Sequence, residues 1–170
     1  MRSSGEEQLD KVGWQLLRVL QEDARLSFSE LGRRVGLSSP AIAERVRRME
    51  DLGIITGYRI MVNPDKLGYA TTVFINIKTS DEHHNKIATF SHTLSEVLEC
   101  HHVTGQDSYI LKVIVSSMEH LEHVISQLRK YGETTTSIVL SSPVKGKMIA
   151  TGPSVRGEPA VSPMFLVENE

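Results

Sequence analysis

The stretch that decides the fold runs from Arg33 to Tyr58 and reads RRVGLSSPAIAERVRRMEDLGIITGY. Its first sixteen residues contain five arginines, together with one glycine and two serines. An isolated run of arginines on a helix is usually a solvated surface. The residues on either side therefore decide whether this stretch is an ordinary surface helix or a helix that faces a polyanion.

The residues before Gly36 predict two helices. Residues 9–23 carry apolar side chains at helical spacing, which indicates an amphipathic helix. A shorter helix follows: Ser27 would cap it, Glu30 stands three residues later as in a capping box, and Gly36 fits a left-handed helix end.

A third helix is predicted after the turn at Leu37. Ser38 is a favoured N-cap residue, and a buried stripe would follow at the i, i+4 and i+7 positions, formed by Ile42, Val46 and Met49. Two helices joined by a tight turn, after a first helix, are typical of a helix-turn-helix domain.

The other faces of the third helix predict a DNA contact. Free N–H groups at its start suit a phosphate or a base edge, and arginine forks fit guanine edges or phosphate oxygens. The predicted set is Ser38, Ser39, Pro40, Glu44, Arg45, Arg47 and Arg48. Arg45 has an alternative partner inside the domain, either Asp51 or Glu30. Residues 25–60 hold seven arginines against four acidic residues although the whole chain carries a net charge of -2, so positive charge is concentrated here.

After the third helix, residues 54–63 predict a strand hairpin or an extended wing, and Asn63-Pro64 predicts a break. The second half of the chain then alternates between strand and helix periods in the order β-α-β-β-α-β, a ferredoxin-like arrangement. The expected segments are 71–78, 82–95, 97–103, 109–115, 118–128 and 135–141. Such a sheet has helices on one face only, so its other face needs a partner, and a second subunit is the simplest one.

Five motifs together resemble the Lrp/AsnC, or feast/famine, family of transcription regulators: LQEDAR, ELGRRVGLS, RVRRMEDLGII, NPDKLGY and VTGQDSYILKV. The resemblance covers about residues 9–142. It implies an α+β protein with a winged helix-turn-helix followed by a ferredoxin-like RAM domain for effector binding and oligomerisation. The expected organisation is a DNA-binding domain at 1–64, a linker at 65–69, a RAM domain at 70–151 and a flexible tail at 152–170.

The turn after the second predicted strand is a candidate effector site. On its residues alone it reads as a plain hairpin turn, for which Gly and Asp need no other reason. The resemblance implies instead that its backbone amides and Asp107 hold the charged ends of an amino acid at a subunit interface. The predicted set is Thr104, Gly105, Gln106 and Asp107, with Thr134, Thr135 and Thr136 of a neighbouring subunit just before the last strand.

Other chemistries are disfavoured by the sequence. It contains no phosphate loop, HExxH motif or nucleophile elbow, so no enzyme is expected, and Cys100 is read as a packed thiol. Seven histidines lie beyond residue 80, but their spacing favours surface positions over a metal site, and no cofactor is expected besides the effector. A single cysteine and the lack of a long apolar run favour the cytoplasm and exclude a membrane helix.

The sequence therefore predicts a sequence-specific regulator that binds double-stranded DNA, assembles as a homodimer or a higher multiple such as an octamer, and responds to an amino acid. Two alternatives stay open. One is an architectural protein that compacts DNA with little sequence preference. The other is an effector-binding module without regulatory DNA binding.

Overall fold

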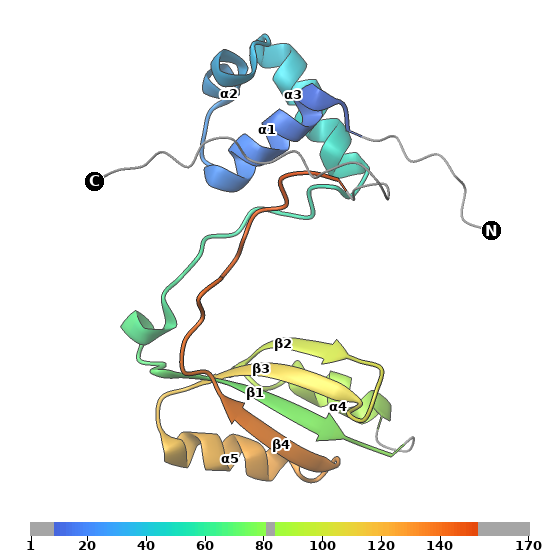
Figure 1. Cartoon of the computed structure of the whole chain (residues 1–170), viewed down its shortest axis with the longest axis vertical. Coiled ribbons are helices and arrows are strands. Elements are labelled where there is room, and N and C mark those ends of the chain that lie inside the picture. The colour runs from blue at the N-terminus through green and yellow to red at the C-terminus, as the bar shows by residue number, and fades with distance from the viewer. Residues whose placement is uncertain (1–8, 81–83, 153–170) are drawn as a thin grey trace, which may run out of the picture. The chain divides into compact units, whose positions relative to one another are not determined.

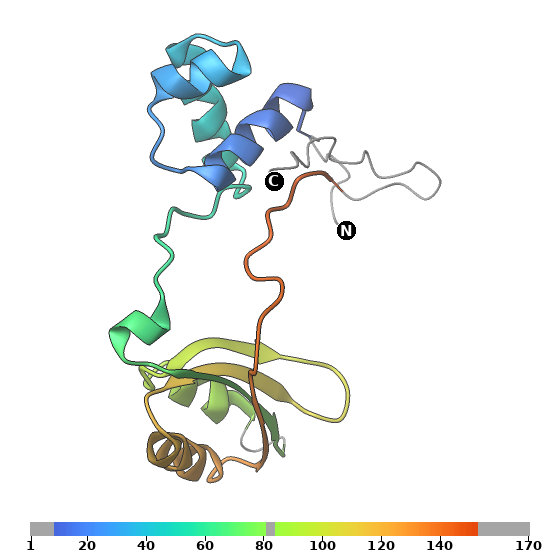
Figure 2. The same ribbon diagram turned by 60° about the vertical axis from the view of Figure 1, so that its left-hand side comes forward.

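The computed structural model describes residues 9–80 and 84–152 of the 170-residue chain. Main-chain contacts divide these residues into two compact units (Figures 1 and 2). We call residues 9–59 with 146–152 the helix-turn-helix unit, and residues 60–145 the sheet unit. The predicted tail, apart from Gly152, lies outside the described residues.

The three predicted helices of the helix-turn-helix unit are confirmed: α1 Lys11–Glu22, α2 Phe28–Val35 and α3 Ser39–Asp51. Each begins at a side-chain cap. Asp10, Ser27 and Ser38 accept hydrogen bonds from main-chain N–H groups three residues further along the chain. Gly36 ends α2 in the left-handed conformation at φ 79°, which glycine adopts without steric cost.

The core of this unit lies where the three helices meet. Its buried side chains are Leu16, Val19, Leu20, Leu31, Ile42, Val46 and Met49, so the predicted stripe of α3 is confirmed. The turn between α2 and α3 packs against α2 at Gly32, where a Cβ atom would lie 2.4 Å from the carbonyl oxygen of Leu37. Only a glycine lets the turn pass this close.

Of the two forms predicted for residues 54–63, a strand hairpin or an extended wing, the strand hairpin is wrong for this structure. Residues 54–63 form no strand, and the next element is a short 3-10 helix, η1, at Pro64–Leu67. A strand needs a hydrogen-bonded neighbour, and none of the described residues pairs with this segment. The side chains of Ile60 and Met61 are therefore 86% and 81% exposed.

The sheet unit confirms the predicted order β-α-β-β-α-β. Its strands form one antiparallel sheet in the order β2-β3-β1-β4. The elements are β1 Thr71–Lys78, α4 His84–Ser91, β2 Val97–His102, β3 Tyr109–Val115, α5 Met118–Leu128 and β4 Glu133–Ile138.

Both helices cover the same face of this sheet (Figure 1). Alternate side chains of the two central strands are buried there with residues of α4 and α5, for example Ile75 of β1, Leu111 of β3 and Leu128 of α5. The opposite face carries Phe74 and Ile110 and has no helix on it among the described residues; we call it the open face.

Two boundaries differ from the predicted ones. The chain leaves the helix-turn-helix unit after Arg59, before the predicted linker, and residues 146–151 pack with that unit instead of with the sheet. The physical reason for the second difference is a pair of hydrogen bonds between the side chain of Gln21 and the main chain of Ile149. Within the described ranges, every helix is too short or too polar to cross a bilayer.

Candidate nucleic-acid interface and effector loop

The start of α3 holds one available main-chain donor. The hydroxyl of Ser38 accepts from the N–H of Ala41 at 3.4 Å, and the carbonyl of Ser38 accepts from Ile42 at 3.0 Å. Pro40 has no N–H. Among the residues that the structure describes, the first turn thus leaves the Ser39 N–H without a hydrogen bond, at the positive end of the helix dipole.

One stripe of α3 points away from the core of the helix-turn-helix unit. Pro40, Glu44 and Arg47 follow at i, i+4 and i+7, and all three are exposed. The side chain of Arg47 is 78% exposed, and its Nε lies 4.0 Å from a carboxylate oxygen of Asp51. An exposed pair at this distance contributes little stability, so the guanidinium is able to exchange it for another anion.

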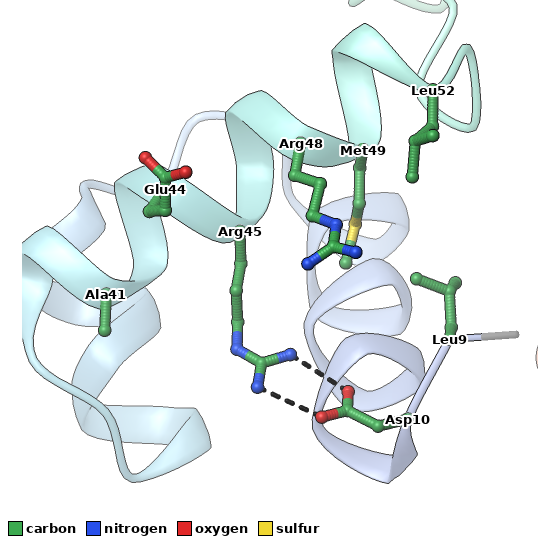
Figure 3. A pocket seen from close by; sticks show the side chains of 8 residues that line it. All are labelled: Leu9, Asp10, Ala41, Glu44, Arg45, Arg48, Met49 and Leu52. Atoms are coloured by element: carbon green, nitrogen blue, oxygen red, sulfur yellow. Dashed lines mark hydrogen bonds and ion pairs between the residues drawn. The ribbon is translucent and has the colours of Figure 1, made fainter. Parts of the chain in front are cut away.

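Arg45 is held inside the unit. Its two terminal nitrogens each donate to one carboxylate oxygen of Asp10 at 3.0 Å (Figure 3). Asp10 also caps α1, because its Oδ1 accepts from the Gly13 N–H at 2.7 Å. These hydrogen bonds, that of Arg45 first, lower the pKa of the Asp10 carboxyl. The partners considered from the sequence, Asp51 and Glu30, are therefore wrong, because Arg45 pairs instead with the residue that caps α1.

Arg45 and Arg48 share a flank of α3 that differs from the outer stripe. Both point towards the start of α1, whereas Glu44 points the other way (Figure 3). The flank borders a pocket of about 530 Å³, which Leu9, Asp10, Ala41, Glu44, Arg45, Arg48, Met49 and Leu52 line. The three arginines of α3 thus form two separate groups: Arg47 on the outer stripe and the other two on the α1 flank.

The arginines at the end of α2 share one carboxylate. Arg33 and Arg34 lie 2.7 and 3.0 Å from the same oxygen of Glu30. These hydrogen bonds lower the pKa of Glu30 to about 2. The capping box is thereby only half formed: the hydroxyl of Ser27 accepts from the Glu30 N–H at 3.2 Å, but the Glu30 side chain turns to the arginines.

The candidate effector loop is a tight connection between β2 and β3. The Val103 N–H donates to the Ser108 carbonyl at 3.0 Å, and Gly105 adopts φ 120°, which few other residues tolerate. Thr104, Gly105 and Gln106 are exposed. Asp107 is half-buried, and its carboxylate accepts from the side-chain amide of Asn76 on β1 at 2.8 Å. The carboxylate is thus fixed from the neighbouring strand.

The three threonines lie inside β4, which corrects the prediction that they precede the last strand. Thr135 pairs with Asn76 in the sheet and therefore shares its open face. Thr134 and Thr136 pair with Ile77 and Ile75, whose side chains are buried under the helices. Of the three, only Thr135 lies on the face that carries the Asn76–Asp107 pair.

Sequence reasoning did not identify two residues of these sites. Asp10 stands directly before α1, and aspartate is a favoured N-cap residue, so the local signal was present. Asn76 is a polar residue on the open side of an alternating strand, but its bond to Asp107 spans 31 residues and leaves no local signal. Wherever side chains are described, no cluster of three or more His, Cys, Asp or Glu residues is suited to a metal ion.

The fold and the two sites define a class of protein: a DNA-binding helix-turn-helix joined to a small-molecule-binding sheet domain. Family comparison agrees. Residues 9–50 match the AsnC-type helix-turn-helix domain, and residues 72–149 match the Lrp/AsnC ligand binding domain. The HTH-type transcriptional regulator LrpB of Bacillus subtilis is 36% identical over 125 residues, which cover 74% of this chain and 84% of that protein.

Solved structures agree as well. B. subtilis LrpC superposes with a TM-score of 0.78 at 31% identity, covering 82% of this chain and 99% of that one. The feast or famine regulatory protein Rv3291c from M. tuberculosis, complexed with L-methionine, gives a TM-score of 0.78 at 32% identity, with 85% and 100% covered. The chain belongs to the Lrp/AsnC family of transcriptional regulators.

Proposed function

We propose that the chain regulates transcription by placing α3 in the major groove of double-stranded DNA, with Arg47 as the principal side chain that contacts it. The single observation that carries this proposal is the exposure of Arg47 on the outer stripe, where its only described ion pair is long and solvated. Glu44 lies one turn before it on the same stripe and can accept from a cytosine amino group.

The start of α3 supplies a phosphate contact in this proposal. The Ser39 N–H and the exposed Ser38 lie at the positive end of the helix dipole, where an anion is stabilised. Phosphate contacts of this kind fix the register of a helix in the groove, and the side chains of the outer stripe then contact the bases.

Arg45 has a positioning role in the proposal. Its paired hydrogen bonds to Asp10 connect α3 to the first turn of α1 and fix the orientation of α3. Arg48 lies beside it and is exposed, so it is suited to a phosphate on the α1 side of the groove.

A second copy of the chain would complete the sheet unit. The open face carries Phe74, which is 38% exposed, and no helix covers it within the described ranges. The unpaired segment that contains Ile60 and Met61 is also exposed and apolar. Two copies would bury both surfaces and present two α3 helices to two half-sites about one DNA turn apart. Higher multiples, up to an octamer, can form from such dimers.

An amino acid is the proposed effector. The Asp107 carboxylate, fixed by Asn76, is suited to an ammonium group, and the exposed Thr104–Gln106 backbone approaches a ligand without obstruction at Gly105. Thr135 of a neighbouring copy could add a hydroxyl from the open face. The complex of Rv3291c with L-methionine supports this ligand class. Because its partner is chromosomal DNA, we expect the protein in the cytoplasm, and the names of its relatives favour a regulator without catalytic activity.

Selection of bound DNA from a random pool tests the function, with and without each of the twenty amino acids. The proposal expects a palindromic consensus whose occupancy changes with at least one amino acid. Enrichment without any consensus would favour the architectural alternative. No enrichment at low salt, together with amino-acid binding, would favour the module without DNA binding.

A further inference from the structure

The outer face of α1 is covered by the far end of the described chain. The core side of this helix carries Leu16 and Leu20, while Trp14, Leu17 and Gln21 follow at i, i+3 and i+7 on the side away from the core. Residues 146–152, which we call the return segment, lie along this outer side and belong to the helix-turn-helix unit.

The side chain of Gln21 forms a pair of hydrogen bonds with the main chain of the return segment. Its side-chain oxygen accepts from the N–H of Ile149 at 3.0 Å, and its side-chain nitrogen donates to the carbonyl of the same residue at 3.1 Å. Both bonds go to the main chain. The side chain of Ile149 stays 69% exposed, so the contact depends on the backbone of the segment more than on the identity of this residue.

Trp14 forms the second contact. A Cβ atom on Gly152 would lie 3.2 Å from Cζ2 of the Trp14 ring, so the main chain at this glycine runs directly against the indole. The distances fit a straight path: Trp14 and Gln21 are about 10 Å apart along a helix, and three extended residues from Ile149 to Gly152 also span about 10 Å.

We propose that the return segment is a docking segment whose binding to α1 ties the DNA-reading helices to β4 by a second chain connection. The first connection leaves the helix-turn-helix unit after Arg59 and reaches β1 at Thr71. The second begins where Val139, just after β4, donates its N–H to the Thr72 carbonyl at 2.9 Å, and it ends on α1.

Two tethers restrict the orientations of a unit more than one. In a dimer on DNA, this restriction reduces the conformational entropy that is lost when both α3 helices enter their half-sites at once. The strand β4 carries Thr135, which is proposed to contact the effector. A ligand that shifts β4 would therefore also shift the return segment and, through it, α1. The docking itself is independent of the proposed function, whereas this consequence for DNA binding rests on it.

The tryptophan at position 14 makes docking measurable, because it is the single tryptophan of the chain. We compare the full chain with chains ending at Gly152 and at Lys145. The first two should give the same emission maximum and acrylamide quenching. The chain ending at Lys145 should emit at longer wavelength and be quenched more strongly. Equal emission and quenching in all three folded proteins would overturn the proposal.

If the chain ending at Lys145 fails to fold, point variants of the full chain test the docking instead. Gln21→Ala should raise quenching of Trp14 and speed hydrogen exchange of the Ile149 amide about fivefold, the factor expected for one net hydrogen bond. Gln15→Ala is the matched control, since Gln15 lies on the same helix but its side chain donates to the Arg34 carbonyl at 3.2 Å. Unchanged exchange at Ile149 in Gln21→Ala would overturn the docking.

The proposed function and the docking of the return segment are tested by different measurements. DNA binding by the full chain tests the function, and this result does not depend on the fluorescence of Trp14. If the full chain binds DNA, the Gln21→Ala variant should bind a two-half-site fragment several-fold more weakly while its affinity for a single half-site stays unchanged. Equal weakening on both fragments would contradict the tether.

Discussion

Arg45 of α3 and Asp10 at the start of α1 face each other with two parallel hydrogen bonds of 3.0 Å. The same carboxylate accepts from the Gly13 N–H and so begins α1. One aspartate therefore caps the first helix and orients the helix proposed to contact DNA. The Asp10 pair places Arg45 on a different side of α3 from Arg47. The sequence alone placed both arginines in one DNA-binding group.

The first prediction concerns this pair. Asp10→Ala should lower the melting temperature more than Arg45→Ala, because the aspartate loses both the ion pair and the helix cap, whereas the arginine loses the pair alone. Thermal unfolding followed by circular dichroism measures both. Glu44→Ala on α3 is the control and should have a smaller effect. A larger decrease in melting temperature in Arg45→Ala than in Asp10→Ala would contradict the double role of the aspartate.

The second prediction concerns the turn between α2 and α3. Gly32→Ala should destabilise the helix-turn-helix unit by about 1–3 kcal/mol, because the added methyl group meets the Leu37 carbonyl and the turn must shift. Ser29→Ala, at an exposed position on the same helix, is the control. Urea unfolding gives both free energies. Equal stability of the two variants would show that the turn accommodates a side chain.

The third prediction concerns pH. The pKa of Glu30 is lowered from 4.5 to about 2, so the folded state holds its carboxylate charged when the unfolded chain already binds a proton. Its contribution to stability is therefore complete above about pH 4.5 and is lost as the pH falls towards 2. A plot of stability against pH should be flatter over this range in Glu30→Gln than in the wild type, whereas Ser29→Ala, which removes no ionisable group from the same helix, should keep the wild-type slope. An unchanged slope in Glu30→Gln would rule out this carboxylate as a contributor.

The fourth prediction concerns the proposed effector. Asp107→Asn should weaken binding of the amino acid that the wild type binds about tenfold or more, because a charged partner of the ammonium group is lost. Asn76→Ala should weaken it less, since the carboxylate remains but is no longer fixed. Glu99→Gln makes the same chemical change on β2 and serves as the control in calorimetric titrations. Equal affinity in Asp107→Asn and the wild type would place the ligand elsewhere.

Local signals explain which features were predictable from the sequence. The caps at Ser27 and Ser38, and the stripe that begins at Ile42, lie within a few residues of the helices they define, and the structure confirms them. The alternation of apolar and polar residues predicted a strand at residues 71–78, and these are the observed bounds of β1. The predicted last strand began at residue 135, two residues after the observed start of β4 at Glu133, so the position of the threonines relative to the strand was missed.

Contacts between distant residues explain what was missed. Asp10 and Arg45 are 35 residues apart, and Gln21 and Ile149 are 128 apart, so no periodicity links them. The hairpin prediction followed from the composition of residues 54–63, but a strand forms only where a neighbour supplies hydrogen bonds, and composition does not reveal the neighbour.

The fifth prediction is the most direct test of the claim that Arg47 and the outer stripe of α3 contact DNA. Binding of the wild type, Arg47→Ala and the control Arg129→Ala to one selected DNA site is measured by fluorescence anisotropy over a series of salt concentrations. We predict that Arg47→Ala weakens binding and, for a phosphate contact, reduces the log–log salt slope by about 0.9, while Arg129→Ala on the sheet unit matches the wild type. Unchanged affinity and slope in a folded Arg47→Ala protein would contradict the account.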